Sequence, residues 1–509
     1  MAESLRVDKP GDDSSEGERS LTERAISGAA WSGAGRVAVQ VVSLCGTMAL
    51  ARLLTPQAFG LVGMARLATG LIDIFRDLGT ASAIIQRSQL TEKLLSSIFW
   101  ANVLLGVSAA LATITVAPIV ALFFHEPETV PIIRALAAGF ILSALGAVHA
   151  ALLSRKMAFR RIAVVEILAA ISTTLIAIGM ALKGAGVWSL VISLLVGTAA
   201  STTLFWLTYP WRPKWVISWH EIRSISSYSL NLSGFSVVNY FSRNADNAIV
   251  GRYLGAFQLG FYQLAYNVML YAIQNVSAVL GRVLFPAFVK VKDDNARFRQ
   301  AYTKGVSMIA VITFPAMGGL MAVAVPFVRA VLGTKWLPVA SLLTILAPVG
   351  LMQSIITTTG NIYSAKGRTD WLFRWGVFAT IIFVGSFCAG IPWGIKGVAV
   401  AYLLANLVLV YPVFSIPFKL IDLKMRDFLR PLWPILFFSA TMSLVVRGLA
   451  FVLRSRTPAT QLAFLVPTGT LIYCSLLALA RPIAAVNLLG VVTVPMKRRR
   501  ARAASLSEM

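Results

Sequence analysis

Charged side chains inside long apolar runs are the residues of this chain best placed to do chemistry. Arg36 lies in the apolar run 27–50, and Arg66 and Asp73 lie in the run 58–82, seven residues apart and therefore on one helix face. If these runs cross a membrane, each charge costs roughly 3 kcal/mol or more unless it faces a wet cavity or a partner. Their presence therefore predicts a hydrated functional cavity.

A second set of polar residues follows the same pattern further along the chain. Its members lie in the runs 162–182, 224–250 and 258–285, and those of the middle run are spaced three or four residues apart, as on one face of a helix. They are Glu166, Asn239, Arg243, Asp246, Asn247 and Arg282. Glu166 also fits a simpler role, an ion pair with a base of the loop that precedes it.

Guanidinium groups gathered in a membrane-embedded cavity suit an anionic group such as a pyrophosphate, because their paired N–H donors bind phosphate oxygens bidentately. The residues expected to bind such a substrate are Arg36, Arg66, Arg243, Arg282, Asn239 and Asn247. Three carboxylates, Asp73, Asp246 and Glu166, are expected to balance the charge of the empty cavity or to carry protons for coupling.

The composition supports the membrane assumption. Of the 509 residues, 57% are hydrophobic and 13% are charged, and the mean hydropathy is +0.75, far from the values of a soluble enzyme. The formal net charge of +25 is spread in pairs and triplets between apolar runs, which is typical of cytoplasmic loops and not of a nucleic-acid surface. The only dense basic cluster is Lys497–Arg500, which suits anionic lipid.

Apolar runs of about 20 residues or more predict an all-α polytopic membrane protein with about 14 spans. The expected spans are 27–50, 58–82, 94–123, 130–153, 162–182, 186–208, 224–250, 258–285, 303–331, 338–362, 370–391, 395–418, 430–453 and 460–480. Loops after even-numbered spans hold most of the Lys and Arg residues, which places both termini in the cytoplasm.

An internal repeat organises these spans. The segment from Arg52 to Ala65 aligns without gaps on the segment from Arg252 to Ala265, and later matches keep a shift of 210 or 211. Spans 1–6 therefore repeat as spans 7–12, as in transporters built from two parallel halves. The expected parts are a tail (1–24), a six-helix bundle (25–210), a linker (211–223), a second bundle (224–420), two appended helices (421–482) and a basic tail (483–509).

Signatures of other functions are missing from the sequence. It contains no Gly-Lys dipeptide, so no P-loop, and no HExxH, GxSxG or DxD pattern. The three cysteines and three histidines lack metal-ligand spacing, so no metal or other cofactor is expected. Two alternatives remain beside a transporter of an anionic substrate: a multidrug exporter, which would favour an acidic cavity, and a membrane-embedded glycan polymerase, which would need a large external loop.

Several segments resemble the bacterial polysaccharide flippases of the Wzx type, within the multidrug/oligosaccharidyl-lipid/polysaccharide superfamily. The similar stretches are Ala51–Gly60, Asp77–Gly79 with Ala83–Arg87, Arg155–Arg160 with Ala163 and Glu166, Gly184–Leu190, Arg243–Asp246, Gly251–Gly255, and Leu259–Tyr262 with Ala265 and Tyr266. The matches cover residues 20–420, and they are most similar to exporters of the colanic-acid type.

The resemblance implies two six-helix bundles that work by alternating access. It implies an undecaprenyl-pyrophosphate-linked oligosaccharide as substrate, flipped across the bacterial inner membrane for capsule, exopolysaccharide or O-antigen synthesis. A polysaccharide polymerase and a chain-length regulator are candidate partners. Asn231, Asn239, Tyr240 and Gln274 could supply contacts to the sugars.

Overall fold

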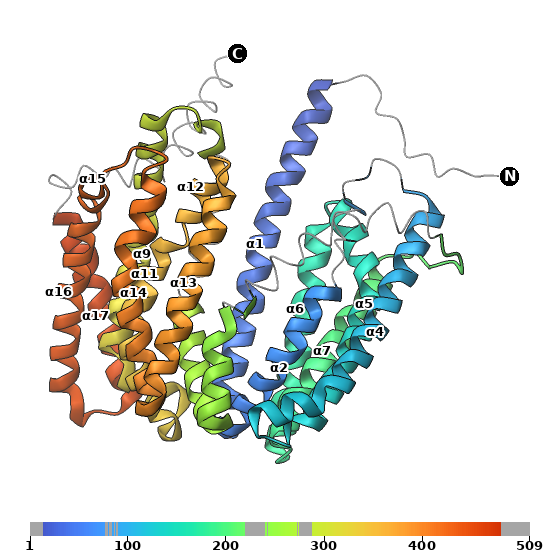
Figure 1. Ribbon diagram of the computed structural model, residues 1–509, viewed down its shortest axis with the longest axis horizontal. Helices are drawn as coiled ribbons and strands as arrows, with labels where there is room; N and C mark the ends of the chain where they lie inside the picture. The colour runs from blue at the N-terminus through green and yellow to red at the C-terminus, as the bar shows by residue number, and fades with distance from the viewer. Residues whose placement is uncertain are drawn as a thin grey trace. The chain divides into compact units, whose positions relative to one another are not determined.

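The computed structural model describes residues 14–76, 80, 84–85, 87, 90–218, 240–241, 243–271, 273 and 288–479. These residues divide into two compact units. One lies within Met1–Asn244 and includes Gly255–Phe257, and the other lies within Ala245–Leu254 and Gln258–Met509. Figure 1 shows the described part of the chain as helices and connecting loops.

Among the described residues, six long helices build the first unit (Figure 1). They are α1 (Ser14–Leu53), α2 (Pro56–Arg76), α4 (Glu92–Phe124), α5 (Thr129–Arg155), α6 (Phe159–Leu182) and α7 (Val187–Thr208). Parallel packing of α1 and α6 depends on small residues: a Cβ on Gly35 would lie 2.6 Å from Ala163 Cβ, and one on Gly46 would lie 2.8 Å from Thr174 Cγ2. These two contacts fix the register of the pair.

Residues 243–244 and Gly255–Phe257 belong to the first unit, and the other helical residues of the stretch 243–271 begin the second unit. Its further helices are α9 (Asn295–Ala322), α10 (Ala324–Phe327), η1 (Val328–Leu332), η2 (Thr334–Trp336), α11 (Leu337–Ile356), α12 (Thr359–Ala365), α13 (Thr369–Gly390), η3 (Ile391–Trp393), α14 (Gly394–Phe418), α15 (Met425–Leu429), α16 (Leu432–Val452), η4 (Leu453–Ser455) and α17 (Pro458–Leu479). Buried aromatic residues form much of its core, among them Phe298, Tyr302 and Phe428.

Ten stretches of the described residues are long and apolar enough to cross a membrane. One of them, Thr369–Phe418, contains both α13 and α14. No strand occurs in the described residues. The expectation of an all-α, multi-pass membrane protein is therefore confirmed.

The aligned segments of the internal repeat share a burial pattern. In the first copy the chain turns between Leu53, where α1 ends, and Pro56, where α2 begins. In the second copy Gly255 has φ +78°, in the left-handed region that glycine adopts without strain. The aligned pair Ala65 and Ala265 is fully buried in both copies.

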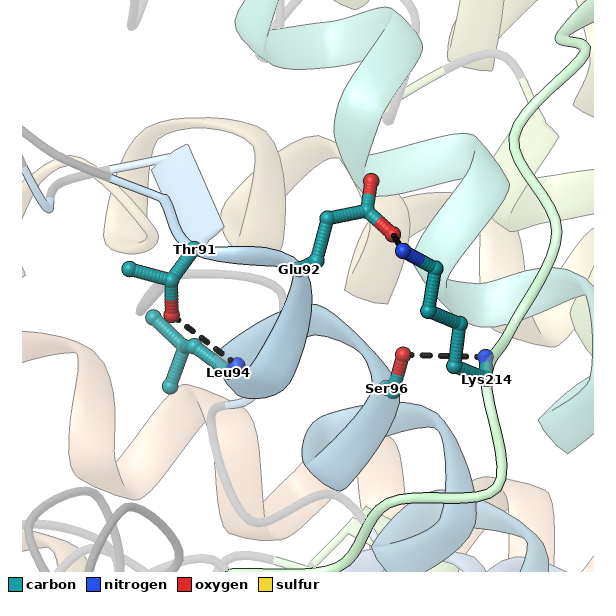
Figure 2. Close-up of polar contacts among 5 residues, drawn as sticks. All are labelled: Thr91, Glu92, Leu94, Ser96 and Lys214. Atoms are coloured by element: carbon teal, nitrogen blue, oxygen red, sulfur yellow. Dashed lines mark hydrogen bonds and ion pairs between the residues drawn. The ribbon is translucent and has the colours of Figure 1, made fainter. Parts of the chain in front are cut away.

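The segment 209–218, which follows α7, is extended and lies along the start of α4. Thr91 caps α4 by accepting a hydrogen bond from the backbone N–H of Leu94 at 3.1 Å, and Glu92 in the first turn pairs with Lys214 Nζ at 3.4 Å (Figure 2). The backbone N–H of Lys214 donates to Ser96 Oγ at 3.1 Å (Figure 2). The start of the expected linker is thus fastened to the first unit.

Gly60 is a position where a single methyl group should destabilise the first unit. A Cβ there would lie 1.8 Å from the backbone oxygen of Ala256, which cannot move aside as a flexible side chain would. We expect Gly60→Ala to cost about 2–3 kcal/mol or more through overpacking. Thermal unfolding in detergent should show a lower midpoint.

The control for this experiment is Gly179→Ala on α6, where nothing lies within 4 Å of the added Cβ. Alanine is the better helix former, so this variant should be as stable as the parent or slightly more stable. Equal unfolding midpoints for Gly60→Ala and the parent would contradict the close approach of α2 to Ala256.

Candidate functional site

Asp246 and Asn247 form a buried polar pair in the helical residues 243–271. Their side chains are 4% and 8% exposed. Asp246 Oδ2 accepts a hydrogen bond from the Tyr262 hydroxyl at 3.2 Å, and Asp246 Oδ1 accepts one from the backbone N–H of Asn247 at 2.7 Å. Within the described residues, Asn247 Oδ1 has no hydrogen-bond partner.

Tyrosines from the helical residues 258–271 and from α14 extend this pair into a polar network. Tyr262 stacks on Tyr266, with ring centroids 6.1 Å apart. Tyr402 of α14 interacts with Tyr266 and lies in the neighbourhood of Asp246. Gln353 of α11 donates a hydrogen bond to the Tyr402 hydroxyl at 2.5 Å. Three helical segments thus place polar groups around one buried carboxyl.

The carboxyl and amide oxygens of this network are groups to which a proton or a monovalent cation can bind. Among the described residues no basic side chain pairs with Asp246, although a buried carboxylate without a partner is costly. Binding a proton, or a monovalent cation at Asp246 and Asn247 Oδ1, removes that cost. The described residues contain no group of three or more His, Cys, Asp or Glu residues that could hold a metal ion.

Arg66 and Arg243 are both exposed and belong to the first unit. The helical turn that contains Arg66 is in contact with Tyr240, which lies one turn before Arg243. The Tyr240 hydroxyl donates to the backbone oxygen of Leu67 at 2.8 Å and lies 3.3 Å from that of Arg66. Arg243 follows Tyr240 by three residues, which is nearly one helical turn. Gly70 makes room for this contact, because a Cβ there would lie 2.6 Å from the Tyr240 hydroxyl.

Arg36 and Glu166 lie at one level of the packed pair α1 and α6. Arg36 follows Gly35, which contacts Ala163, and Glu166 follows Ala163 by three residues. Both side chains are exposed. No ion pair joins them in the described part of the chain, so the two charges remain available to a third group.

The other residues expected at the site either have few contacts that define their surroundings or lie outside the described residues. Asp73 is exposed on α2, about two turns after Arg66. Arg282 and Asn239 lie outside the described residues, as do Asn231 and Gln274. Tyr402 and Gln353 were not expected at the site from the sequence. The one local feature that points to Tyr402 is its spacing of four residues from Asn406, another polar residue in the same apolar run.

Comparison with known proteins places this architecture in one family. Residues 49–341 match the family described as "Polysaccharide biosynthesis protein". The chain is 30% identical over 449 residues to the lipopolysaccharide biosynthesis protein WzxC of Escherichia coli, covering 84% of this chain and 89% of WzxC. It is 28% identical over 469 residues to the teichuronic acid biosynthesis protein TuaB of Bacillus subtilis, covering 91% and 97%.

Solved structures agree with the fold. The inward closed conformation of the lipid II flippase MurJ superposes with a TM-score of 0.71 at 15% identity, over 88% of this chain and 99% of MurJ. An inward-facing multidrug transporter of the MOP superfamily superposes with a TM-score of 0.60 at 16% identity, over 75% and 94%. The chain therefore belongs to the polysaccharide biosynthesis protein family and is a Wzx-type transport protein with the MOP superfamily fold, not an enzyme.

Proposed function

We propose that this protein flips undecaprenyl-pyrophosphate-linked oligosaccharide repeat units across the bacterial inner membrane for surface polysaccharide synthesis. Relatives named for lipopolysaccharide, teichuronic acid and succinoglycan biosynthesis support the glycan class. MurJ, which shares the fold, is named as a flippase of a lipid. The isoprenoid stays in lipid while the pyrophosphate and sugars cross through a hydrated path.

The observation that carries this proposal is the placement of Arg66 and Arg243. Both are exposed although they lie on helices of a membrane protein, and Tyr240 brings their turns together. Arginines on contacting turns suit a pyrophosphate, since each guanidinium can bind two phosphate oxygens. Arg36, and Arg282 outside the described residues, complete the proposed anion path, with Asn239 and Asn247 for polar contacts to the substrate.

Asp246 is the proposed coupling residue of the second unit. Its buried carboxyl and the unpartnered Asn247 Oδ1 offer a place for a proton or a monovalent cation. Asp73 and Glu166, which are exposed, are proposed to balance the charge of the arginines while no substrate is bound.

The proposal includes the topology expected from the sequence. It has 14 spans in two repeated six-helix bundles (25–210 and 224–420), two appended helices (421–482), and both termini in the cytoplasm together with the tails 1–24 and 483–509 and the linker 211–223. Transport by alternating access, and contact with a glycan polymerase and a chain-length regulator, belong to the same proposal.

Leaflet-resolved measurement of the lipid-linked oligosaccharide tests this function directly. In cells that lack the gene, labelled undecaprenyl-pyrophosphate oligosaccharide should accumulate on the cytoplasmic leaflet, and restoring the gene should relieve that accumulation. A normal leaflet distribution together with missing long-chain glycan would place the protein in polymerisation or later export and would overturn the flippase proposal.

A further inference from the structure

The segment 209–218 is held to the first unit along its length. Besides the contacts of Lys214 with Glu92 and Ser96 (Figure 2), the backbone N–H of Ser218 donates to Ser97 Oγ at 2.9 Å. The Trp100 Nε1–H donates to the backbone oxygen of Lys214 at 2.9 Å. Ser96 and Ser97 are fully buried, and their hydroxyl oxygens accept these backbone hydrogen bonds, while the Ser97 hydroxyl also donates to the backbone oxygen of Lys93 at 2.7 Å.

These contacts hold apolar side chains of the segment in exposed positions on the protein surface. The ring of Trp215 stacks on that of Trp100, with centroids 4.1 Å apart and planes 24° apart, yet Trp215 is 87% exposed. Ile217, two residues on, is 59% exposed. A tryptophan fixed on one face and open on the other is suited to a membrane–water interface, where its ring partitions favourably.

Two exposed cations without acidic partners among the described residues contact the start of the same segment and the end of α7. Lys156 Nζ lies 5.0 Å from the centroid of the Tyr209 ring. Arg212 donates to the backbone oxygens of Trp211 and Tyr209 at 2.9 and 3.4 Å, so both cations contact Tyr209 or its backbone. Among the described residues neither cation has an acidic partner, whereas Lys214 has Glu92.

The position of this cluster in the fold favours a lipid as its occupant. α7 ends at Thr208, α4 begins at Glu92 and α5 ends at Arg155, so the ends of three membrane helices meet at this level. Residues 84–93, 154–161 and 209–218 contain eight basic residues and one acidic residue, Glu92. An anionic phospholipid fits this surface, because its headgroup can pair with the basic residues and its acyl chains can cover the exposed rings.

We propose that Lys156, Arg212 and Trp215 form a binding site for an anionic phospholipid. The phosphate lies between the Lys156 ammonium and the Arg212 guanidinium, and the Trp215 ring lies at the level of the glycerol and upper acyl chain. Such a lipid fixes the depth of the first unit in the bilayer and holds the start of the linker at the membrane surface.

Lipid titration of the full-length protein tests the site. Native mass spectrometry of protein released from phosphatidylcholine nanodiscs with increasing phosphatidylglycerol should show a tightly retained phosphatidylglycerol. Each of Lys156→Gln and Arg212→Gln should weaken it about fivefold, and the double variant about 25-fold, since a basic residue near an anionic surface contributes roughly one fivefold step. Unchanged retention in the double variant would overturn the proposal.

A matched control is Arg368→Gln. Arg368 also covers a tryptophan, Trp371, at 4.4 Å, but it is paired with Asp370 at 3.1 Å and should contribute little to lipid retention. Loss of phosphatidylglycerol in this variant equal to that in the double variant would show a general charge effect and contradict a specific site. Preferential retention of polyprenyl pyrophosphate over phosphatidylglycerol at Lys156 and Arg212 would assign the site to the transported lipid and overturn the proposal.

The depth of Trp215 gives a readout that does not depend on binding. The fluorescence difference between the parent and Trp215→Phe isolates this ring, and lipids brominated near the glycerol should quench it more than lipids brominated near the chain ends. Quenching only by an aqueous quencher would show that Trp215 lies in water and would contradict the interfacial position.

Discussion

Replacing Arg66 or Arg243 with alanine is expected to abolish glycan export while leaving the protein folded and inserted. Both side chains are exposed, so truncation removes no buried contact that the fold requires. A bidentate contact to a pyrophosphate contributes about 2–3 kcal/mol, so translocation should fall about 30- to 150-fold. The measurement is the leaflet distribution of the lipid-linked oligosaccharide in cells that carry each variant, with membrane protein levels matched.

Lysine variants separate charge from geometry. Arg243→Lys retains the cation but not the planar fork, so export should recover only in part. Equal activity of Arg243→Lys and the parent would show that a point charge is enough.

Arg447→Ala is the matched control for these variants. Arg447 is also exposed and lies in a membrane helix, α16, outside the proposed anion path, so its loss should leave export unchanged. Full export by both Arg66→Ala and Arg243→Ala would remove these residues from the substrate site.

The contact between Tyr240 and α2 offers a further check on the arrangement of these arginines. Tyr240→Phe removes the hydrogen bond to the backbone oxygen of Leu67 but keeps the ring, so export should fall less than in either arginine variant. A fall as large as that of Arg66→Ala would show that Tyr240 does more than hold its helical turn on α2.

The helices could be expected from the sequence because their information is local. Runs of about 20 apolar residues need helical hydrogen bonding in a membrane, and the expected runs 130–153 and 186–208 match α5 and α7 closely. Charged residues within an apolar run, such as Arg66 and Asp246, can also be identified from the sequence because they too are a local feature.

Contacts between distant segments could not be expected in this way. Gln353 and Tyr402 reach the neighbourhood of Asp246 only because α11 and α14 pack beside the helical residues 243–271, about 100 and 150 residues away in sequence. The sequence also predicts 211–223 simply as a linker. Nothing local shows that Ser96 and Ser97 would accept hydrogen bonds from Lys214 and Ser218.

Removing the carboxyl charge at position 246 is expected to stop coupled transport without unfolding the second unit. Asp246→Asn keeps an oxygen that can accept from the Tyr262 hydroxyl, so the buried network loses its titratable group and little of its shape. Asp246→Ala instead leaves Tyr262 without this acceptor, which should cost about 1–3 kcal/mol of stability. The two variants therefore separate coupling from folding.

The measurement is glycan export by Asp246→Asn, compared with export by the parent after sodium is replaced by potassium or after a protonophore is added. If Asp246 holds the coupling cation, the variant should export at least tenfold less, and the treatment that removes the coupling gradient should lower the parent to the same level. Asp370→Asn, on an exposed carboxylate already paired with Arg368, should export normally. Normal export by Asp246→Asn would mean that the buried carboxyl serves only the packing of Tyr262 and that the energy for transport enters elsewhere.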